Sequence, residues 1–291
     1  MFRVAYLMPL VSLVLIPAVP AAESSTPDGQ PHLRPQAKMC GVGLDDVRWT
    51  EGFWAERWEL CRREMLPSVE RALSDPANSE QLINLKIAAG LATGEYRGTD
   101  WSDGDCYKWL EALALMFATT RDPELDRKMD KWIAIVAGAQ SPDGYLSTNM
   151  TLRQRPRYVP PPRRYGGTFH EMYNMGHLLT AACTHHQATG KDNFLRIARK
   201  TGDHLHGVLK PGMPELVVTS GNLPVIMGLV DLYRTTGDRR YLETAQVIVD
   251  ARGAAPGGSD LTQDHVPLRE ETEAVGHAVF ATYLYCVATD V

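Results

Sequence analysis

Two histidines frame a short polar stretch, HEMYNMGHL, that begins at His170. On an α-helix His170, Tyr173 and His177 fall at positions i, i+3 and i+7, which is one face. Imidazole and phenol groups on one face could ligate a metal or line a sugar-binding surface. The two histidines are two turns apart, roughly 10 Å along the axis, whereas zinc–nitrogen bonds are about 2 Å long. The spacing therefore argues against one zinc ion held by this pair alone.

Three other polar clusters could take part in chemistry. They are DWSDGDCYKWLEA with Asp103 and Asp105, AQSPDGYLST with Tyr145, and QDHVPLREETEAVGHAV with His277. Each has a structural alternative: helix caps for the aspartates, packing for the tyrosine, and a core position within an apolar helix for His277. Taken together, aromatic faces beside Asp, Glu, His and Asn groups are typical of sugar-binding sites.

Helical periodicity dominates from Asp45 onward, and no stretch shows a convincing strand alternation. The pattern predicts about nine helices, at 54–73, 80–92, 104–121, 123–140, 170–189, 191–208, 220–236, 238–252 and 271–289. The histidines of the pair His185-His186 are predicted to lie on the surface near a helix end, where cationic histidine suits the helix dipole.

A weak internal repeat links these helices. Each unit reads helix, Thr-Gly, charged turn, aromatic-Leu pair, second helix; copies begin at Tyr173 and Gly221, with a looser copy at Ala118. Gly190 and Gly237 should end the first helix of a pair, and the Asp that follows should begin the second. Repeated antiparallel helix pairs form either an open solenoid or a closed toroid. The irregular repeats, with varied insertions on one side, favour an all-α (α/α)6 toroid or barrel, incomplete in this chain.

Composition limits the class of protein. The net charge is −5 with both signs interspersed, which argues against nucleic-acid binding. Residues 1–22 have a basic start, an apolar run and small residues at the end, as in a signal peptide; a retained membrane helix is the alternative. Residues 23–44 resemble a disordered leader, and 45–291 form the helical domain. We therefore expect a secreted or periplasmic protein without membrane association after signal cleavage. The odd number of cysteines, five, favours small buried hydrophobic residues over a disulfide framework.

Seven motifs together resemble one enzyme family. DGDCYKWLEA, AQSPDGYL, HEMYNMGHLLTAA, LYRTTGDRRYL, DARG, QDHVPLRE and EAVGHAV occur in the order seen in family 127 glycoside hydrolases, the β-L-arabinofuranosidase type. The resemblance covers about 47–291. It implies an (α/α)6 barrel followed by β-sandwich domains. It also implies hydrolysis of a terminal sugar with retention of configuration, by a cysteine thiolate bound to zinc with further Cys and Glu ligands.

The resemblance also assigns roles to residues. His170 and His277 match two histidines that contact the sugar, and Asn222 aligns with a third; asparagine can bind a hydroxyl but carries no charge. Asp103, Asp105 and Tyr145 are additional substrate-binding candidates.

The catalytic residues of the family are not matched by any residue of this chain. The catalytic Glu, the zinc-binding Glu and the paired cysteines are expected downstream of Val291, the last residue of the sequence. We therefore expect this chain to be an N-terminal portion that binds plant-type glycan sugars but holds no zinc and no catalytic residue.

Two other functions remain open. One is a non-catalytic sugar-binding or degenerate protein. The other is a different α/α-toroid enzyme, such as an unsaturated-uronide hydrolase or a sugar epimerase, with Asp103, Asp105 or His277 as acid/base. The apolar edge of an unclosed toroid also predicts oligomerisation or aggregation of the isolated chain.

Overall fold

Helices make up all the regular structure of the part of the chain that the computed structural model describes, namely residues 41–75, 77, 79–153, 170–212, 223–254 and 257–291. The predicted signal peptide and most of the leader lie outside these residues. The helices are α1 (Gly52–Leu60), the π-helical η1 (Cys61–Met65), α2 (Leu66–Ser74), α3 (Gln81–Ala88), α4 (Ser102–Thr120), α5 (Pro123–Ala139), α6 (Thr148–Leu152), α7 (Glu171–Thr189), α8 (Asn193–Val208), α9 (Pro224–Thr236), α10 (Arg239–Ala251) and α11 (Ala278–Asp290), with short 3-10 turns η3 (Asp260–Thr262) and η4 (Leu268–Glu270). Within the described residues none of these helices combines the length and the apolar character needed to cross a membrane.

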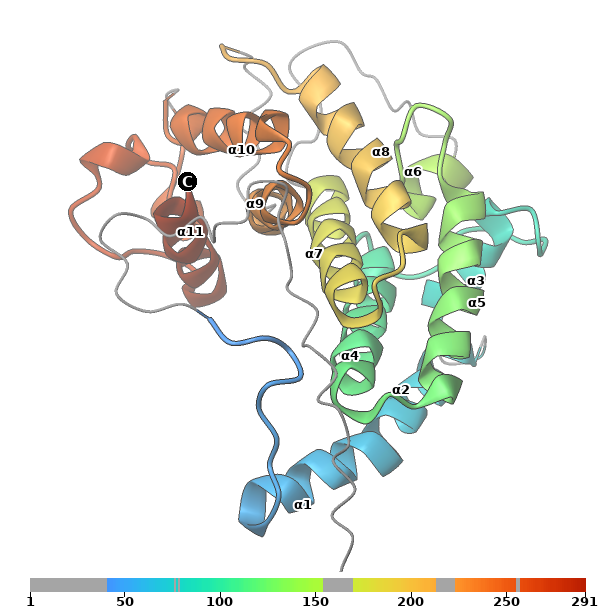
Figure 1. The fold of residues 1–291 in the computed structure, drawn as a ribbon. Coiled ribbons are helices and arrows are strands. Elements are labelled where there is room, and N and C mark those ends of the chain that lie inside the picture. The colour runs from blue at the N-terminus through green and yellow to red at the C-terminus, as the bar shows by residue number, and fades with distance from the viewer. Residues whose placement is uncertain (1–40, 76, 78, 154–169, 213–222, 255–256) are drawn as a thin grey trace, which may run out of the picture. The chain divides into compact units, whose positions relative to one another are not determined.

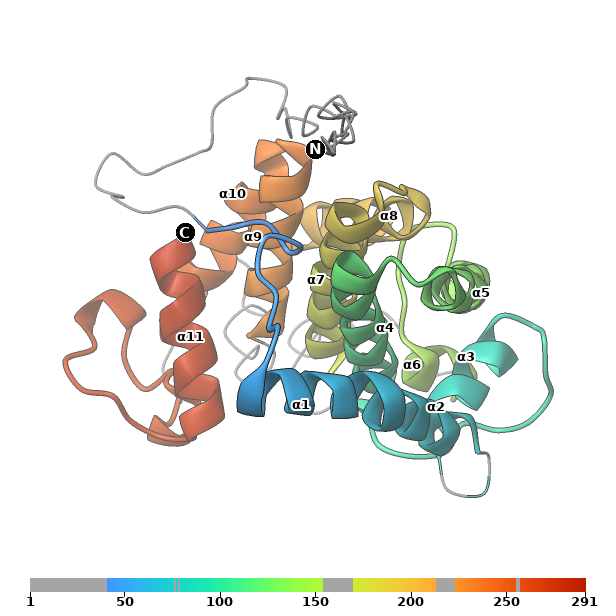
Figure 2. The same ribbon diagram turned by 60° about the horizontal axis from the view of Figure 1, so that its bottom comes forward.

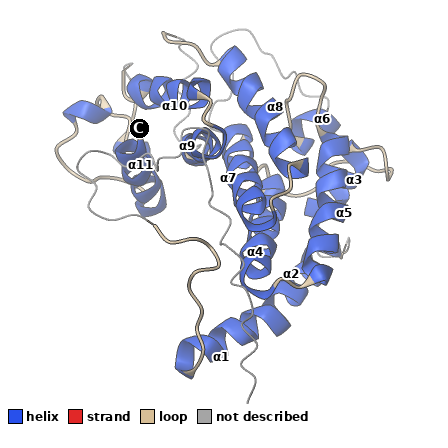
Figure 3. Cartoon of the chain, viewed as in Figure 1, coloured by secondary structure: helices blue, strands red, loops and turns tan. Residues whose placement is uncertain are grey.

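The helices from α4 onward form two layers (Figure 1). The inner layer runs α4, α7, α9, α11, and each of these packs on the next; α5, α8 and α10 form the outer layer and follow α4, α7 and α9 as antiparallel partners. Figure 3 shows helices and loops only. This is the predicted alternation of inner and outer helices of an incomplete (α/α)6 barrel, and each of the nine predicted helices has a counterpart among the described residues.

Neighbouring inner helices run parallel (Figure 2). Near the start of α4, Gly104 N donates to Asn174 Oδ1 of α7 at 2.9 Å, and just past its end Arg121 donates to the carbonyl of Ala188 at 2.8 Å. On α7 and α9, Thr180 donates to Asp231 at 2.8 Å. Because the helices are parallel, their N-terminal ends gather at one end of the layer, which is where the sequence candidates from the polar clusters lie.

The three helix pairs share one turn chemistry. In each pair the last threonine of the first helix donates its hydroxyl to the carbonyl four residues earlier and accepts the backbone N–H two residues later, at 2.6–2.8 Å and 3.1–3.3 Å for Thr120, Thr189 and Thr236. The residue between is left-handed: Gly190 (φ 72°), Gly237 (φ 73°) and, in the looser copy, Arg121 (φ 54°). This confirms the predicted glycine stops. Asp238 also caps α10 as predicted, through its bond to Arg240 N, whereas Asp192 makes no cap bond to α8.

A glycine inside the opening motif sets the spacing of α7 and α9. A Cβ on Gly176 would lie 2.2 Å from the carbonyl carbon of Pro224, the first residue of α9. Gly228, one turn further along α9, lies equally close to α7, since a Cβ there would sit 2.5 Å from Gly176 O. Only residues without a side chain allow this approach, so the two glycines fix how closely the inner helices pack.

Two sequence predictions about helices were wrong. The last helix begins at Ala278, not at residue 271, because Gly276 adopts φ 78° with its backbone against Asp260 O and so interrupts the helix. His277 therefore lies at the N-cap position and not in the middle of an apolar helix. His185 was predicted to lie on the surface, but it is buried against the ring of Phe194. The short helix α6 was not predicted.

Candidate functional site

A line of aromatic side chains crosses the N-terminal end of the inner layer. The ring of His170 lies 5.8 Å from that of Tyr173, which lies 4.6 Å from that of His177. Trp101, just before α4, continues the line at 5.2 Å from His170, and Tyr283 of α11 continues it at 6.4 Å from His177. The predicted single face of the HEMYNMGHL helix is confirmed. The aromatic line continues from α7 to α11 on one side and to the N-cap residue of α4 on the other.

Lys108 is the cation beside this line. Its Nζ donates to Tyr173 Oη at 2.6 Å and to Asp105 Oδ1 at 3.4 Å. Burial disfavours the charged form of Lys108, but the bonds to Tyr173 and Asp105 outweigh it, so the pKa lies above its ordinary value. The sequence candidates include Asp105 but not Lys108, although the spacing of three residues already places both on one face of the helix.

His177 is neutral in this setting. Its side chain is 4% exposed, and burial, together with the nearby Lys108 ammonium, lowers its pKa to about 3. Its Nε2 is buried and has no hydrogen-bond partner among the described residues. A neutral, enclosed imidazole is typical of a packed residue behind a site and does not fit a general base at neutral pH.

Asp103 is a structural anchor in this arrangement. It is buried, and its carboxylate accepts bonds from the backbone N–H and the hydroxyl of Thr148, which starts α6. Burial raises its pKa. Asn174 completes the anchor, because its amide donates to Asp100 O and accepts from Gly104 N. The start of α4 is thereby fixed on α6 and α7, and Asp103 has no accessible group to offer a ligand.

Tyr145 is likewise enclosed. Its ring is buried and edge-on to His204, and its hydroxyl donates to the carboxylate of Glu171, the first residue of α7. Burial raises the pKa of Glu171 to about 7, against the opposing effect of that hydrogen bond. This hydrogen bond fixes Glu171, the residue directly after His170. Tyr145 and Glu171 are both buried, so they support the site from behind and expose no surface of their own.

Of the two remaining sequence candidates, the structure describes His277 but not Asn222. His277 is exposed, donates its backbone N–H to Leu261 O at 3.0 Å, and stacks on Phe280 at 4.3 Å. It lies at the N-terminal end of α11, the same end of the inner layer as His170. Asn222 lies outside the described residues.

Further along the inner helices two carboxylates are half-buried. Glu111 accepts a bond from Thr184 at 3.3 Å and Asp231 accepts one from Thr180 at 2.8 Å. Burial raises the pKa of both, and the charge of Asp231 raises that of Glu111 further. They lie one or more turns away from the aromatic line and touch none of the predicted sugar contacts through a described bond.

The described residues do not fit the zinc and thiolate group that the family resemblance implies. No three His, Cys, Asp or Glu side chains among them converge closely enough to hold a metal ion. Cys106 and Cys183 are buried, and burial raises both thiol pKa values, that of Cys183 to about 12, so neither forms a ready thiolate. Cys61 and Cys286 lie on separate helices, α11 for Cys286 and the π-helical segment for Cys61.

The end of α11 is ordinary packed structure. Val291 follows the helix as its C-cap residue and lies half-buried against the core, with no catalytic group of its own.

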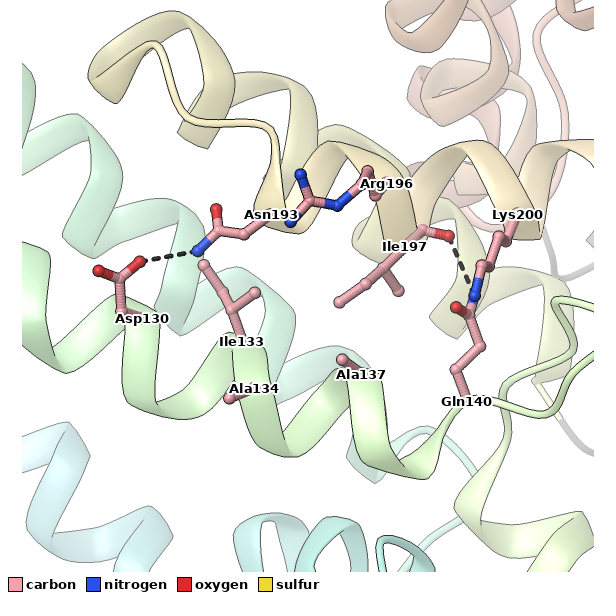
Figure 4. A pocket seen from close by; sticks show the side chains of 9 residues that line it. All are labelled: Asp130, Ile133, Ala134, Ala137, Gln140, Asn193, Arg196, Ile197 and Lys200. Carbon is pink, nitrogen blue, oxygen red and sulfur yellow. Dashed lines mark hydrogen bonds between the residues drawn. The ribbon is translucent and has the colours of Figure 1, made fainter.

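A groove of about 330 Å³ opens elsewhere, between α5 and α8 of the outer layer (Figure 4). Two bonds tie its walls together, from Asn193 to Asp130 at 2.7 Å and from Gln140 to the carbonyl of Ile197 at 3.0 Å. It brings together none of the residues predicted to bind a sugar. The N-terminal end of the inner layer is therefore the better candidate site.

Known proteins resemble this chain over most of its length. A family model described as Beta-L-arabinofuranosidase, GH127 catalytic domain, matches residues 46–291. A curated relative from Bifidobacterium longum subsp. longum, described as non-reducing end beta-L-arabinofuranosidase, is 31% identical over 281 residues, which is 82% of this chain and 42% of the relative.

Two solved structures agree. The GH127 β-L-arabinofuranosidase Ara127N-Se from Geobacillus stearothermophilus T6 gives a TM-score of 0.75 at 34% identity, over 83% of this chain and 41% of that one. The GH127 β-arabinofuranosidase BT3674 gives 0.76 at 34% identity, over 86% and 40%. The chain thus spans about two fifths of the length of these relatives. The chain belongs to the GH127 family of glycoside hydrolases, of the β-L-arabinofuranosidase type.

Proposed function

We propose that this chain is the substrate-binding part of a secreted, retaining β-L-arabinofuranosidase that acts on terminal sugars of plant-type glycans. His170, Asn222 and His277 are the proposed sugar contacts, with Asp105 as a further contact. Asp103 and Tyr145 support these residues through their buried bonds. The zinc- and cysteine-dependent chemistry of the family is assigned to residues other than those described.

The observation that carries the proposal is the backbone of His170. This residue has φ 50° and ψ 27°, the left-handed region, at the N-terminal end of α7. For a residue with a Cβ this conformation costs about 1 kcal/mol relative to ordinary backbone, and Gly or Asn adopts it more readily. A strained histidine at the accessible end of the inner layer is better explained by a ligand contact than by fold stability.

The test uses the 291-residue chain and isothermal titration calorimetry with methyl β-L-arabinofuranoside. We expect binding by the unsubstituted chain and its loss in His170→Asn. The same substitution should leave the free energy of unfolding in urea unchanged or higher, because Asn tolerates the left-handed conformation. Loss of binding without loss of stability identifies a ligand contact. Equal binding by His170→Asn, or no binding by the unsubstituted chain, contradicts the proposal.

Turnover and zinc content separate the proposal from its alternatives. We expect no hydrolysis of p-nitrophenyl β-L-arabinofuranoside and less than stoichiometric zinc in the purified chain. Hydrolysis with stoichiometric zinc would place the catalytic group within this chain. A zinc-independent activity lost in Asp105→Asn would instead favour a uronide hydrolase or an epimerase; Asp103 is a poor acid/base for such an enzyme because Thr148 engages its carboxylate.

A further inference from the structure

One face of α4, extended by the N-cap residue Trp101, presents three accessible side chains at the candidate site. Trp101, Asp105 and Lys108 occupy positions i, i+4 and i+7, which lie above one another on a helix. Their neighbours Asp103 and Cys106 are buried, whereas Trp101 is 44% exposed and the side chains of Asp105 and Lys108 are 37% and 38% exposed. This face lies beside the His170, Tyr173 and His177 face of α7, because Trp101 contacts His170 and Lys108 contacts Tyr173.

The ammonium of Lys108 has more N–H donors than it has acceptors among the described residues. An ammonium has three N–H donors. Within the described residues two acceptors engage it, Tyr173 Oη at 2.6 Å and Asp105 Oδ1 at 3.4 Å. The third donor is left for solvent or a ligand. The carboxylate of Asp105 is also weakly engaged, since from the described residues it accepts two long bonds of 3.4 Å, from Lys108 and from Gln81 Nε2.

The position of this ammonium is fixed by its surroundings. Tyr173, its closer partner, has its ring held edge-on between His170 and His177 at 5.8 Å and 4.6 Å. A donor held in place before binding loses less conformational freedom when a ligand arrives than a mobile surface lysine does. Lys108 is therefore set up to recognise an acceptor at one defined position.

We propose that Asp105 and Lys108 together bind two neighbouring hydroxyl groups of a neutral sugar, with Trp101 as the apolar contact for the sugar ring. The carboxylate accepts from one hydroxyl while the ammonium donates to the oxygen of the next. Trp101 supplies an exposed aromatic surface for the C–H groups of the ring. This inference rests on the proposed function and adds to it the residues that select the substrate.

The adjacent charges also set a preference between neutral and acidic sugars. A hydroxyl pair satisfies both Asp105 and Lys108, because hydroxyls donate and accept. A uronate carboxylate could bind the ammonium but would meet the like charge of Asp105. The pair therefore favours neutral sugars over uronates.

The experiment measures, by calorimetry, the affinity of each protein variant for each of three ligands, so that the loss from a substitution can be compared with the loss from a missing hydroxyl group. The ligands are methyl β-L-arabinofuranoside and its 2-deoxy and 3-deoxy analogues. Lys108→Met keeps the length of the side chain but removes the charged donor, so it should weaken binding of the parent glycoside about tenfold or more. At least one deoxy analogue should bind the unsubstituted chain equally weakly and lose nothing further in Lys108→Met. Lys131→Met, on the exposed side of α5, is the matched control and should bind as the unsubstituted chain does.

Asp105→Asn provides a second, nearly isosteric test. It should weaken binding of methyl β-L-arabinofuranoside and strengthen binding of methyl α-D-galacturonoside relative to the unsubstituted chain, because the repelling charge is gone. Circular dichroism checks that each variant is folded.

The outcomes separate the inference from the function on which it rests. If the unsubstituted chain binds and His170→Asn does not, but Lys108→Met and Asp105→Asn bind both glycosides within about twofold of the unsubstituted chain, the inference is wrong and the proposed function stands. If the unsubstituted chain binds no glycoside, both are wrong. A loss in Lys108→Met that disappears with a deoxy analogue supports the inference.

Discussion

Glu171 should make the stability of this chain fall as pH rises through neutrality. The carboxyl group is 5% exposed, and burial raises its pKa to about 7 from the ordinary 4.5. Its described hydrogen bond, from Tyr145, favours the ionised form but is outweighed. In the unfolded chain the group ionises near pH 4.5, so between that pH and about 7 the folded state binds more protons than the unfolded state.

The size of the effect follows from the gap between the two pKa values. The free energy of unfolding should decrease as pH rises from about 4.5 and level off above about 7. The gap corresponds to a loss of roughly 3 kcal/mol in total. Glu171→Gln keeps an acceptor for the Tyr145 hydroxyl but cannot ionise. Relative to the natural chain, this variant should gain stability across that pH range by up to the same amount.

Urea unfolding of the two proteins at several pH values between about 5 and 8.5 tests this expectation. The difference between them isolates Glu171, because buried histidines contribute the opposite slope to both. Glu270→Gln, at an exposed position, is the matched control for the loss of one carboxyl group. Tyr145→Phe removes the bond that favours ionisation and should steepen the loss. A pH-independent difference between Glu171→Gln and the natural chain would refute the reasoning.

Four further substitutions test the packing, the turns and a buried histidine by urea unfolding. Gly176→Ala should cost about 1–3 kcal/mol because the new Cβ meets the backbone of Pro224, whereas Gly207→Ala, with open space around it, should stabilise by about 0.5–1 kcal/mol; equal effects would contradict the close approach of α7 and α9. Thr236→Val removes both turn bonds of its hydroxyl and should cost about 1 kcal/mol. His185 has its pKa lowered to about 4 by burial, so it stabilises the fold above pH 6.5 and loses that contribution as pH falls toward 4; His185→Leu should abolish this acid-dependent loss.

The helices and their pairing could be predicted from sequence because their causes are local. Apolar residues recur at helical spacing, and Thr-Gly with a following polar residue supplies the turn bonds within a few residues. Even the looser copy keeps this chemistry, since Arg121 takes the left-handed position of the glycines. The parallel order of the inner helices then follows from repeating one hairpin.

The parts that sequence reasoning missed depend on partners far along the chain. The buried role of Asp103 comes from Thr148, 45 residues away. The start of α11 is set by the backbone of Gly276 against Asp260, and a helical pattern cannot show such a contact. Lys108 was visible in its polar cluster, but its significance comes from Tyr173, 65 residues later.

The gathering of helix ends also accounts for the kind of side chain found at the site. Each N-terminal helix end carries roughly half a positive charge, and the inner helices bring several of these ends together beside the Lys108 ammonium. Burial and the Lys108 ammonium lower the pKa of His177, so this imidazole is neutral. A neutral imidazole both donates and accepts hydrogen bonds, which suits hydroxyl groups better than it suits anions. The repeat that builds the barrel thus brings His170, Tyr173 and Lys108 together at one end, which supports the neutral, hydroxyl-rich ligand proposed for this site.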